Sequence, residues 1–214
     1  MIMVVLLPRL IKMPSIEMKS EKTLLFGGTF DPVHKGHLYL LRMAEEHTDY
    51  NRVIIVPAYI SNFKQGTHPA SGADRMAMLS IAIKEYYELY KESRLEIILS
   101  DIELNREGVS YTYDTVVSIL KEYPIEGRLG FLMGDDLLEG LDRWYRFDDL
   151  KHLVTFVCFT RGFHEAESET DADISYIPIE AYHSSSTEIR EGKFGNLTKG
   201  VYEYVVSHGL YKTL

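Results

Sequence analysis

Three things are scarce in this sequence, and each scarcity excludes a class of protein. The single cysteine, Cys158, rules out an internal disulfide framework and favours a reducing compartment, so we expect a cytoplasmic protein. No stretch of 18 apolar residues occurs, so no segment is predicted to span a bilayer. No block of five or six lysines or arginines occurs and the formal net charge is −9, so we expect no nucleic-acid partner.

The remaining composition is that of an ordinary folded domain. Hydrophobic residues make up 45% and charged residues 26% of the 214 residues, which predicts one domain over residues 23–214. The apolar run Ile2–Leu7 stops at Pro8 and lacks a small-residue cleavage pattern, so it is a poor signal peptide. We expect residues 1–22 to be an N-terminal extension that is disordered or reflects an incorrectly assigned start site.

Strand-like and helix-like patterns alternate along the chain. Short apolar runs predict buried strands at 23–27, 52–57, 95–99, 128–133, 153–159 and 174–179. Helical patterns occupy about 36–48, 74–91, 111–123, a short stretch at 136–141, a segment from 186, and about 199–208 before Gly209. This alternation predicts an α/β fold: a doubly wound, mostly parallel sheet flanked by helices, with a small C-terminal helical extension.

The loop after the first predicted strand carries an unusual set of residues. It reads GGTFDPVHKGH from Gly27, and it places His34 and His37 near the first turn of the next helix, on one face. Ligands bind at the carboxyl ends of strands in such sheets, glycines let a ligand approach the main chain, and a helix start attracts phosphate. Two imidazoles there add hydrogen-bond donors, which suits charge developing on a phosphoryl group.

Two alternative roles for the histidines carry less weight. They could form half of a zinc site, but no cysteine lies nearby and no obvious second pair of ligands follows. They could also be purely structural, which is the usual role of a lone helical histidine. Their pairing at one helix start, directly after a strand and two glycines, favours a binding role.

A second segment with the character of a phosphate site lies about 150 residues further on. In SSSTEIREGK, Ser185 as N-cap with Glu188 at the third helical position fits a capping box, with Ser186 and Thr187 in the first turn and Arg190 one turn on. An isolated pattern of this kind is common and usually means only a well-capped helix.

Together the two segments resemble the signatures of nucleotidylyltransferases that carry H-x-G-H and S-S-T-x-I-R motifs. The resemblance implies a Rossmann-like sheet and an ATP site in which His34 and His37 bind the reacting phosphates and Arg190 holds the phosphate tail. It assigns to ATP and its phosphates Gly27, Gly28, Thr29, Phe30, Ser185, Ser186 and Thr187. Ser184 stands where the family usually has isoleucine, a change expected to affect packing only.

The middle of the chain is similar to bacterial nicotinate-nucleotide adenylyltransferases. YTYDT at 111–115 and GDDLLEGLDRWYRFDDL at 134–150 carry this likeness. The matched positions are Gly134 and Asp136 for nucleotide, Trp144 and Tyr145 for the nicotinate, Thr112 near the base carboxylate, and Lys64 for phosphate. Asn62-Phe63 replaces a Pro-His pair of the family, which leaves the geometry of that loop and the acceptor preference open.

The resemblance implies a specific reaction. The AMP moiety of ATP would pass to nicotinate mononucleotide, giving nicotinate adenine dinucleotide and pyrophosphate, without a covalent intermediate and with Mg²⁺ accompanying ATP. Pantetheine-phosphate adenylyltransferase shares both phosphate motifs, but its chains tend to be shorter and lack the segment from G-x-D to Trp-Tyr. An inactive nucleotide sensor remains open, whereas a class I tRNA synthetase fragment would need more chain and a basic face. The choice between nicotinate and nicotinamide, the oligomeric state and the protonation of both histidines also stay open.

Overall fold

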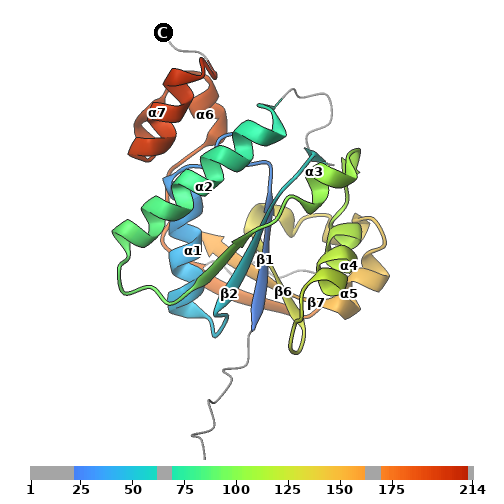
Figure 1. Cartoon of the computed structure of the whole chain (residues 1–214). Coiled ribbons are helices and arrows are strands. Elements are labelled where there is room, and N and C mark those ends of the chain that lie inside the picture. Colours follow the sequence, from blue (N-terminus) through green and yellow to red (C-terminus); the bar gives the residue numbers. More distant parts are fainter. Residues whose placement is uncertain (1–21, 62–68, 162–169, 212–214) are drawn as a thin grey trace, which may run out of the picture.

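The computed structural model describes residues 22–61, 69–161 and 170–211. At its centre is a six-stranded sheet in which every neighbouring pair of strands is parallel (Figure 1). Its strands are β1 (Thr23–Gly28), β2 (Arg52–Pro57), β4 (Glu96–Leu99), β6 (Leu129–Gly134), β7 (Val154–Arg161) and β8 (Ile174–Ile179). The predicted strands are therefore confirmed to within two residues at each end.

The strand order locates the binding edge of the sheet. It runs β4-β2-β1-β6-β7-β8, so the chain winds outward from β1 in one direction and then outward from β6 in the other. Such a reversal between two neighbouring strands leaves a crevice beyond their carboxyl ends, where ligands bind in sheets of this type. The loops that follow β1 and β6 meet at this point.

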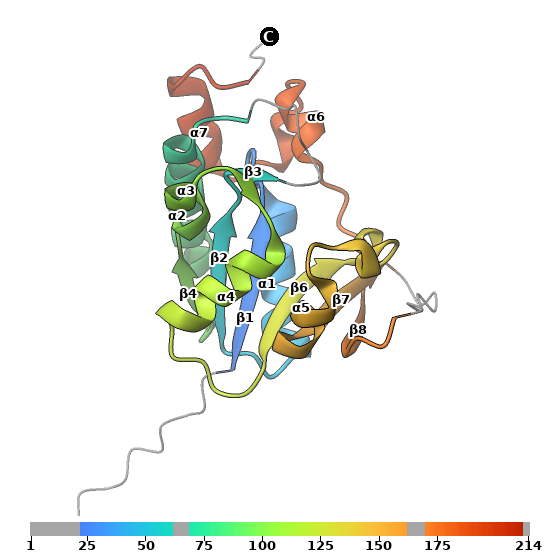
Figure 2. The ribbon, with the colours of Figure 1, turned by 90° about the vertical axis from the view of Figure 1, so that its right-hand side faces the viewer.

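Helices cover both faces of the sheet. They are α1 (Lys35–His47), α2 (Gly72–Leu89), α3 (Ile102–Arg106), α4 (Thr112–Glu122), α5 (Phe147–Leu153), α6 (Ser186–Arg190) and α7 (Lys199–Ser207). Figure 2 shows α4 and α5 in front of the sheet and α1 behind it. Two short strands, β3 (Ile60–Ser61) and β5 (Val109–Ser110), pair separately beside the main sheet.

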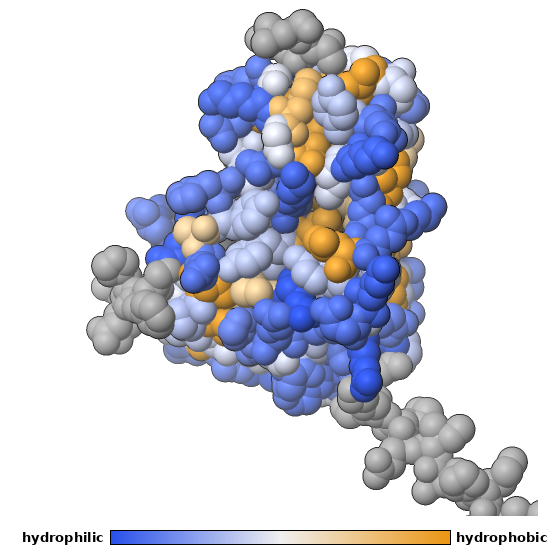
Figure 3. Space-filling model, turned by 90° about the vertical axis from the view of Figure 1, so that its left-hand side faces the viewer, coloured by the Kyte–Doolittle hydropathy of each residue, from blue (hydrophilic) through white to orange (hydrophobic). Residues whose placement is uncertain are grey.

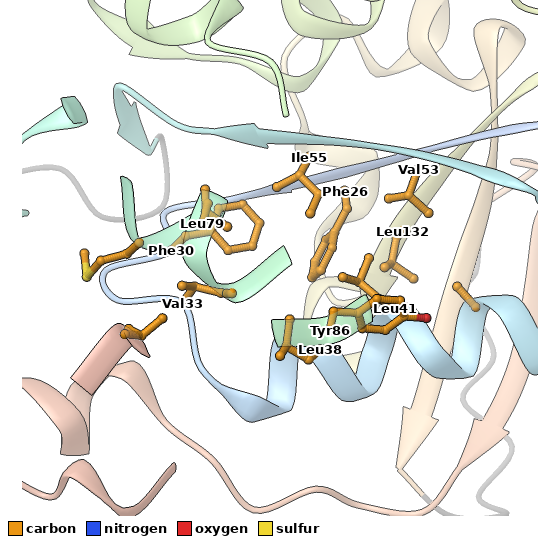
Figure 4. Packing of buried hydrophobic residues seen from close by; sticks show 14 of the residues in the cluster. Phe26, Phe30, Val33, Leu38, Leu41, Val53, Ile55, Leu79, Tyr86 and Leu132 are labelled. Carbon is orange, nitrogen blue, oxygen red and sulfur yellow. The ribbon is translucent and has the colours of Figure 1, made fainter. Parts of the chain in front are cut away.

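Alternation along β1 explains why two hydrophobic cores form. Leu24 and Phe26 face the cluster that contains α1 and α2, whereas Leu25 faces the cluster that contains α4 and α5. On α1, Leu38 and Leu41 repeat at helical spacing and are buried against the sheet (Figure 4). Full burial of one such side chain stabilises the folded state by roughly 1.5–3 kcal/mol. Leu38 and Leu41 together therefore hold α1 against the sheet.

Two helices were not predicted, and one predicted helix is broken. The short helices α3 and α5 lie in segments whose few apolar residues continue into neighbouring strand patterns, so no separate helical period is visible. The helix expected at 136–141 is instead two 3₁₀ turns, Asp135–Leu137 and Leu141–Arg143. Gly140 separates them with a φ of 78°, a left-handed conformation that interrupts a right-handed helix.

The C-terminal helical extension packs against α2 and ends as predicted. Gly209 has a φ of 61° and the N–H of Leu210 donates to the carbonyl of Val205 at 3.0 Å, which closes α7 with a Schellman motif. Gly200 of α7 lies against Ile81, where a Cβ would come within 2.7 Å of the isoleucine side chain. This close approach of α7 to α2 requires a glycine.

The outer surface is mostly polar on the face that Figure 3 presents. Hydrophilic residues cover most of that face, and the apolar residues drawn in colour show as small separate areas. Across residues 22–61, 69–161 and 170–211, no helix combines the length and the apolar character needed to cross a membrane. Cys158 is fully buried in β7, as its apolar surroundings predict, and burial raises the pKa of its thiol to about 12.

Candidate active site

A buried arginine fixes the loop that follows β1. Arg75 of α2 is 2% exposed, and its Nη1 donates to the carbonyls of Thr29 at 2.9 Å and Ala58 at 2.7 Å. Its Nε donates to the carbonyl of Ala70 at 3.0 Å. Hydrogen bonds from a charged donor are among the stronger ones in proteins, so this clamp joins the loops that follow β1 and β2 and sets the path of the chain toward α1.

The two histidines lie face to face at the start of α1. His34 is the N-cap residue, and the centroids of the His34 and His37 rings are 3.8 Å apart. The main-chain N–H of His34 donates to Nδ1 of His37 at 3.1 Å. This hydrogen bond holds the His37 ring across the N-terminus of α1. The prediction that both histidines share one face of the first turn is confirmed.

Burial favours the neutral form of the His34 imidazole. His34 is 8% exposed, and burial lowers its pKa to about 4. Within the described part of the chain, its Nδ1 is buried without a hydrogen-bond partner. His34 can therefore offer an N–H group to an anion at neutral pH without carrying a full positive charge.

The glycine between the histidines lets the chain pack closely against the His34 ring. A Cβ at Gly36 would lie 3.0 Å from two atoms of the His34 ring and 3.1 Å from Cβ of Ser184. Ser184, the residue that replaces the isoleucine of the family, thus packs directly beside this turn of α1. The H-K-G-H spacing reflects this close approach as well as the placement of the imidazoles.

The two phosphate motifs touch each other. Ser186 of α6 donates from its hydroxyl to the carbonyl of Pro32 at 3.0 Å. Arg190 donates from Nη1 to the carbonyl of Asp31 at 2.6 Å and from Nη2 to Oγ1 of Thr187 at 3.0 Å. The proximity expected of the two distant segments is confirmed. The capping box is only partly correct, because Ser185 is the N-cap of α6 but its side chain makes no capping hydrogen bond.

Asp31 connects the loop to three further parts of the chain, which the sequence did not indicate. Its Oδ1 accepts from the N–H of Ala70 at 3.0 Å and from the hydroxyl of Tyr211 at 2.7 Å, and its Oδ2 lies 3.8 Å from Nη1 of Arg190. Burial, followed by the hydrogen bond to Asp31, raises the pKa of Tyr211. The only sequence signal for Asp31 was its place in an Asp-Pro turn.

A cavity of about 200 Å³ opens in front of the two imidazoles. Of the predicted residues it is lined by His34, His37, Gly134 and Asp136. Lining residues that were not predicted include Tyr39, Asp135, Arg161, Tyr182 and Ser184. Arg161 pairs with Asp135 at 2.8 Å, and the Tyr39 and Tyr182 rings stack with centroids 5.2 Å apart. This cavity combines aromatic walls with polar groups that suit a nucleotide.

A second cavity of about 320 Å³ lies on the other side of Asp136. Of the predicted residues it is lined by Gly27, Gly28, Thr29, Thr112, Asp136 and Trp144. Trp144 stands edge-on to Phe131, with ring centroids 5.7 Å apart. Its side chain therefore packs against the hydrophobic core and also lines the cavity. Glu103, Ser110 and Thr115 also line this cavity and were not predicted.

Asp136 lines both cavities, and Gly134 makes room for it. A Cβ at Gly134 would lie 2.5 Å from Oδ1 of Asp136, far inside van der Waals contact. The G-x-D spacing therefore lets this carboxylate fold back over the end of β6. As a result, a ligand that filled both cavities would pass the Asp136 carboxylate.

Seven predicted residues are not among the described lining of either cavity. Four of them belong to the second phosphate motif, which lies against the loop after β1 instead: Ser185, Ser186, Thr187 and Arg190. Phe30 is 2% exposed with a φ of 49°, and its side chain packs in the core against Phe26, with ring centroids 5.3 Å apart. Tyr145 is 48% exposed and packs against Tyr111, with ring centroids 4.7 Å apart. Lys64, together with Asn62-Phe63, lies outside the described residues. No group of three or more metal-ligating side chains occurs within residues 22–61, 69–161 and 170–211.

Comparison with known proteins identifies the family. The cytidylyltransferase-like family model matches residues 25–192. Nicotinate-nucleotide adenylyltransferase of Bacillus subtilis strain 168 is 33% identical over 201 residues, which cover 90% of this chain and all of the relative. A probable nicotinate-nucleotide adenylyltransferase of Halalkalibacterium halodurans is 36% identical over 199 residues, covering 88% of this chain and 90% of the relative.

A solved structure agrees on the fold. Plasmodium falciparum nicotinic acid mononucleotide adenylyltransferase complexed with NaAD matches with a TM-score of 0.71 at 20% identity, covering 89% of this chain and 97% of that one. The Rossmann-like fold expected from the sequence is confirmed by this match and by the strand order. On the strength of the near full-length sequence matches, the chain belongs to the nicotinate-nucleotide adenylyltransferase family.

Proposed function

We propose that this protein transfers the AMP moiety of ATP to nicotinate mononucleotide, giving nicotinate adenine dinucleotide and pyrophosphate in the synthesis of NAD. The observation that carries the proposal is the pair of cavities that adjoin at Asp136, one containing the paired imidazoles and the other Trp144. An adenylyl transfer needs two nucleotides whose phosphates meet between their bases. Two adjacent cavities at the switch point of a parallel sheet satisfy this need.

ATP is proposed to occupy the cavity beside His34 and His37. The start of α1 and the two imidazoles would donate hydrogen bonds to the α-phosphate and to the leaving pyrophosphate. Arg190 and the hydroxyls of α6 would hold the phosphate tail. These hydroxyls belong to Ser185, Ser186 and Thr187, and Lys64 is proposed to add a charge from the loop that carries it.

Nicotinate mononucleotide is proposed to occupy the cavity beside Trp144. A flat pyridine ring gains from stacking on an indole. Thr112 begins α4, an 11-residue helix whose first N–H groups have no partner within the helix, and these groups suit the nicotinate carboxylate. Tyr145 would contact the nucleotide at the rim of the cavity.

The chemistry is a single in-line displacement. An oxygen of the acceptor phosphate forms a bond to the α-phosphorus of ATP while the bond from that phosphorus to the bridging oxygen breaks, and the electron pair leaves with pyrophosphate. The nucleophile is already an anion, so no general base and no covalent intermediate are needed. Alignment of the two polyanions is the main contribution of the protein and is worth up to roughly 7–11 kcal/mol.

Mg²⁺ is proposed to enter bound to the triphosphate, as part of the substrate. Its role there is to offset phosphate charge. We further propose that residues 23–214 form the functional domain and that the protein works in the cytoplasm. A chain that begins at Met18 should keep full activity and stability, whereas loss of either would show that the preceding residues contribute.

The decisive test is a comparison of acceptors. Mg²⁺-ATP is supplied with nicotinate mononucleotide, nicotinamide mononucleotide or phosphopantetheine in turn, and pyrophosphate release is measured. The proposal predicts the highest kcat/KM with nicotinate mononucleotide. A reaction with phosphopantetheine alone would reassign the acceptor, and no reaction with any of the three would favour a nucleotide sensor.

A further inference from the structure

Arg190, which is proposed to hold the phosphate tail, has a carboxylate as its neighbour. Oδ2 of Asp31 lies 3.8 Å from Nη1 of Arg190, close enough for an ion pair but too far for a hydrogen bond. The side chain of Arg190 is 33% exposed and that of Asp31 only 6%. If the carboxylate closed this gap, it would form charge-assisted hydrogen bonds to the guanidinium and occupy donors that a phosphate needs. The contacts that hold the Asp31 carboxylate in place therefore bear on how well Arg190 binds ATP.

Two donors from distant segments hold the other oxygen of this carboxylate. Oδ1 of Asp31 accepts from the main-chain N–H of Ala70 at 3.0 Å and from the hydroxyl of Tyr211 at 2.7 Å. Ala70 lies just before α2, and Tyr211 lies after α7, near the C-terminus. Because both bonds end on Oδ1, they resist the movement that would bring either carboxylate oxygen onto Arg190.

The conformation of Tyr211 suits a residue that is held in one position. Its φ is 64°, in the left-handed region that residues with a Cβ seldom adopt. Such conformations persist where surrounding contacts fix them, and they are frequent at functional sites. The Tyr211 side chain packs against the hydrophobic cluster that contains α1 and α2, which supports the ring while its hydroxyl reaches Asp31. Burial, followed by the hydrogen bond to Asp31, raises the pKa of Tyr211, so the hydroxyl keeps its proton at neutral pH.

We propose that Tyr211 is a positioning residue for ATP binding, whose hydroxyl holds the Asp31 carboxylate away from the guanidinium of Arg190. This inference rests on the proposed function, in which Arg190 binds the phosphate tail. Without the hydroxyl, the carboxylate keeps one donor on Oδ1 and can move onto Arg190 as a competing anion. The phosphates of ATP then have to displace an internal ion pair before they bind. Tyr211 thus acts through Asp31 and Arg190 and touches neither substrate.

The first test is steady-state kinetics of Tyr211→Phe, which removes the hydroxyl and keeps the ring. The KM for Mg²⁺-ATP should rise about tenfold, near the lower end for the loss of a hydrogen bond to a charged group. The KM for nicotinate mononucleotide and the kcat at saturating ATP should change little, because only the phosphate tail meets the competing carboxylate. An unchanged KM for ATP overturns the inference, as does an equal rise in both KM values.

The matched control is Tyr204→Phe. Tyr204 also belongs to the C-terminal extension and also donates its hydroxyl to a carboxylate, reaching Oδ1 of Asp74 on α2 at 3.0 Å. Its loss should weaken the attachment of α7 but leave the KM for ATP near that of the unchanged protein. If Tyr204→Phe raises this KM as much as Tyr211→Phe does, the effect is a general loss of packing and the inference is wrong.

A double variant tests whether the charge of Asp31 is the cause. Asp31→Asn removes the charge and keeps the shape of the side chain, so it has no anion to release onto Arg190. Tyr211→Phe should therefore raise the KM for ATP in the unchanged protein and have little effect on it when combined with Asp31→Asn. Equal effects in the two backgrounds overturn the role of the Asp31 carboxylate.

Binding measurements need no acceptor and separate this inference from the proposed function. Calorimetry compares Mg²⁺-ATP with AMP, which lacks the phosphate tail, in the unchanged protein and in Tyr211→Phe. The variant should bind ATP more weakly and AMP as before, and equal weakening of both overturns the inference. If the unchanged protein does not react nicotinate mononucleotide with ATP, the proposed function fails, whereas the comparison of ATP with AMP still decides the role of Tyr211.

Discussion

The guanidinium of Arg190 donates to the main-chain carbonyl of Asp31 at 2.6 Å, across 159 residues of sequence. Asp31 lies three residues before His34, so this bond places the arginine beside the loop that carries both imidazoles. The neighbouring bond from Ser186 to Pro32 fixes α6 against the same loop. The two phosphate motifs thus form one surface, whose parts hold each other in position before any ligand binds.

Replacing Arg190 should therefore damage both positioning and charge. Arg190→Ala should lower kcat/KM by about 10²–10³, the scale for loss of one donor to a developing charge. Arg190→Lys keeps the charge but loses the forked geometry that reaches Asp31 and Thr187 together, so most of the loss should remain. Steady-state kinetics on variants with near-native melting temperatures is the measurement. Full activity in the lysine variant would show that charge alone is needed.

The histidines should affect kcat more than substrate binding. His34→Ala and His37→Ala should each lower kcat by about 10²–10³, because each removes an N–H aimed at phosphate oxygens in the transition state. His47→Ala is the control, since His47 is exposed at the far end of the same helix. An unchanged kcat in a folded His34 or His37 variant would remove that residue from the mechanism.

Local patterns predicted the central strands well because β1, β2, β6 and β7 are buried along most of their length. A strand such as β2 reads as an uninterrupted apolar run between polar turns, so its limits are visible in the sequence. Reading apolar runs in this way did not reveal α5. The buried apolar residues of this helix lead directly into the apolar run that forms β7. Hydrophobic pattern alone does not separate a short helix from the strand that follows it.

The sequence indicated the site residues that belong to short local motifs. It did not indicate those whose position depends on contacts between distant parts of the chain. His34, His37 and Arg190 stand in recognisable spacings, and their segments lie together as expected. Glu103 gave no such signal, because its burial and its bond to Thr115 depend on how α3 packs against α4. Phe30 is the opposite case, because it stands within the motif but its side chain packs in the core.

Stability should depend on pH through His34. Its pKa is about 4 in the folded protein and near 6.5 when unfolded, so the unfolded chain binds the proton more readily. The free energy of unfolding should therefore fall as the pH drops from about 6.5 to 4, by roughly 3 kcal/mol from this residue. Urea denaturation at pH 7 and pH 4.5 measures the difference. His34→Asn, which keeps an N-cap residue without a titrating group, should show a smaller loss, and an equal loss would mean that other groups are responsible.

The substitution Gly36→Ala should lower the activity of the protein while leaving its stability nearly unchanged. Alanine is a better helix former than glycine by up to about 1 kcal/mol, which offsets part of the cost of crowding. The new Cβ would lie 3.0 Å from two atoms of the His34 ring, so this ring would have to shift slightly. We expect the free energy of unfolding of Gly36→Ala to lie within about 1 kcal/mol of that of the unchanged protein. Its kcat should nevertheless fall at least tenfold, because hydrogen-bond donors to a transition state tolerate little displacement. Gly195→Ala is the control, since a Cβ there meets nothing within 4 Å. If Gly36→Ala kept full kcat, the position of the His34 ring would not matter to the reaction.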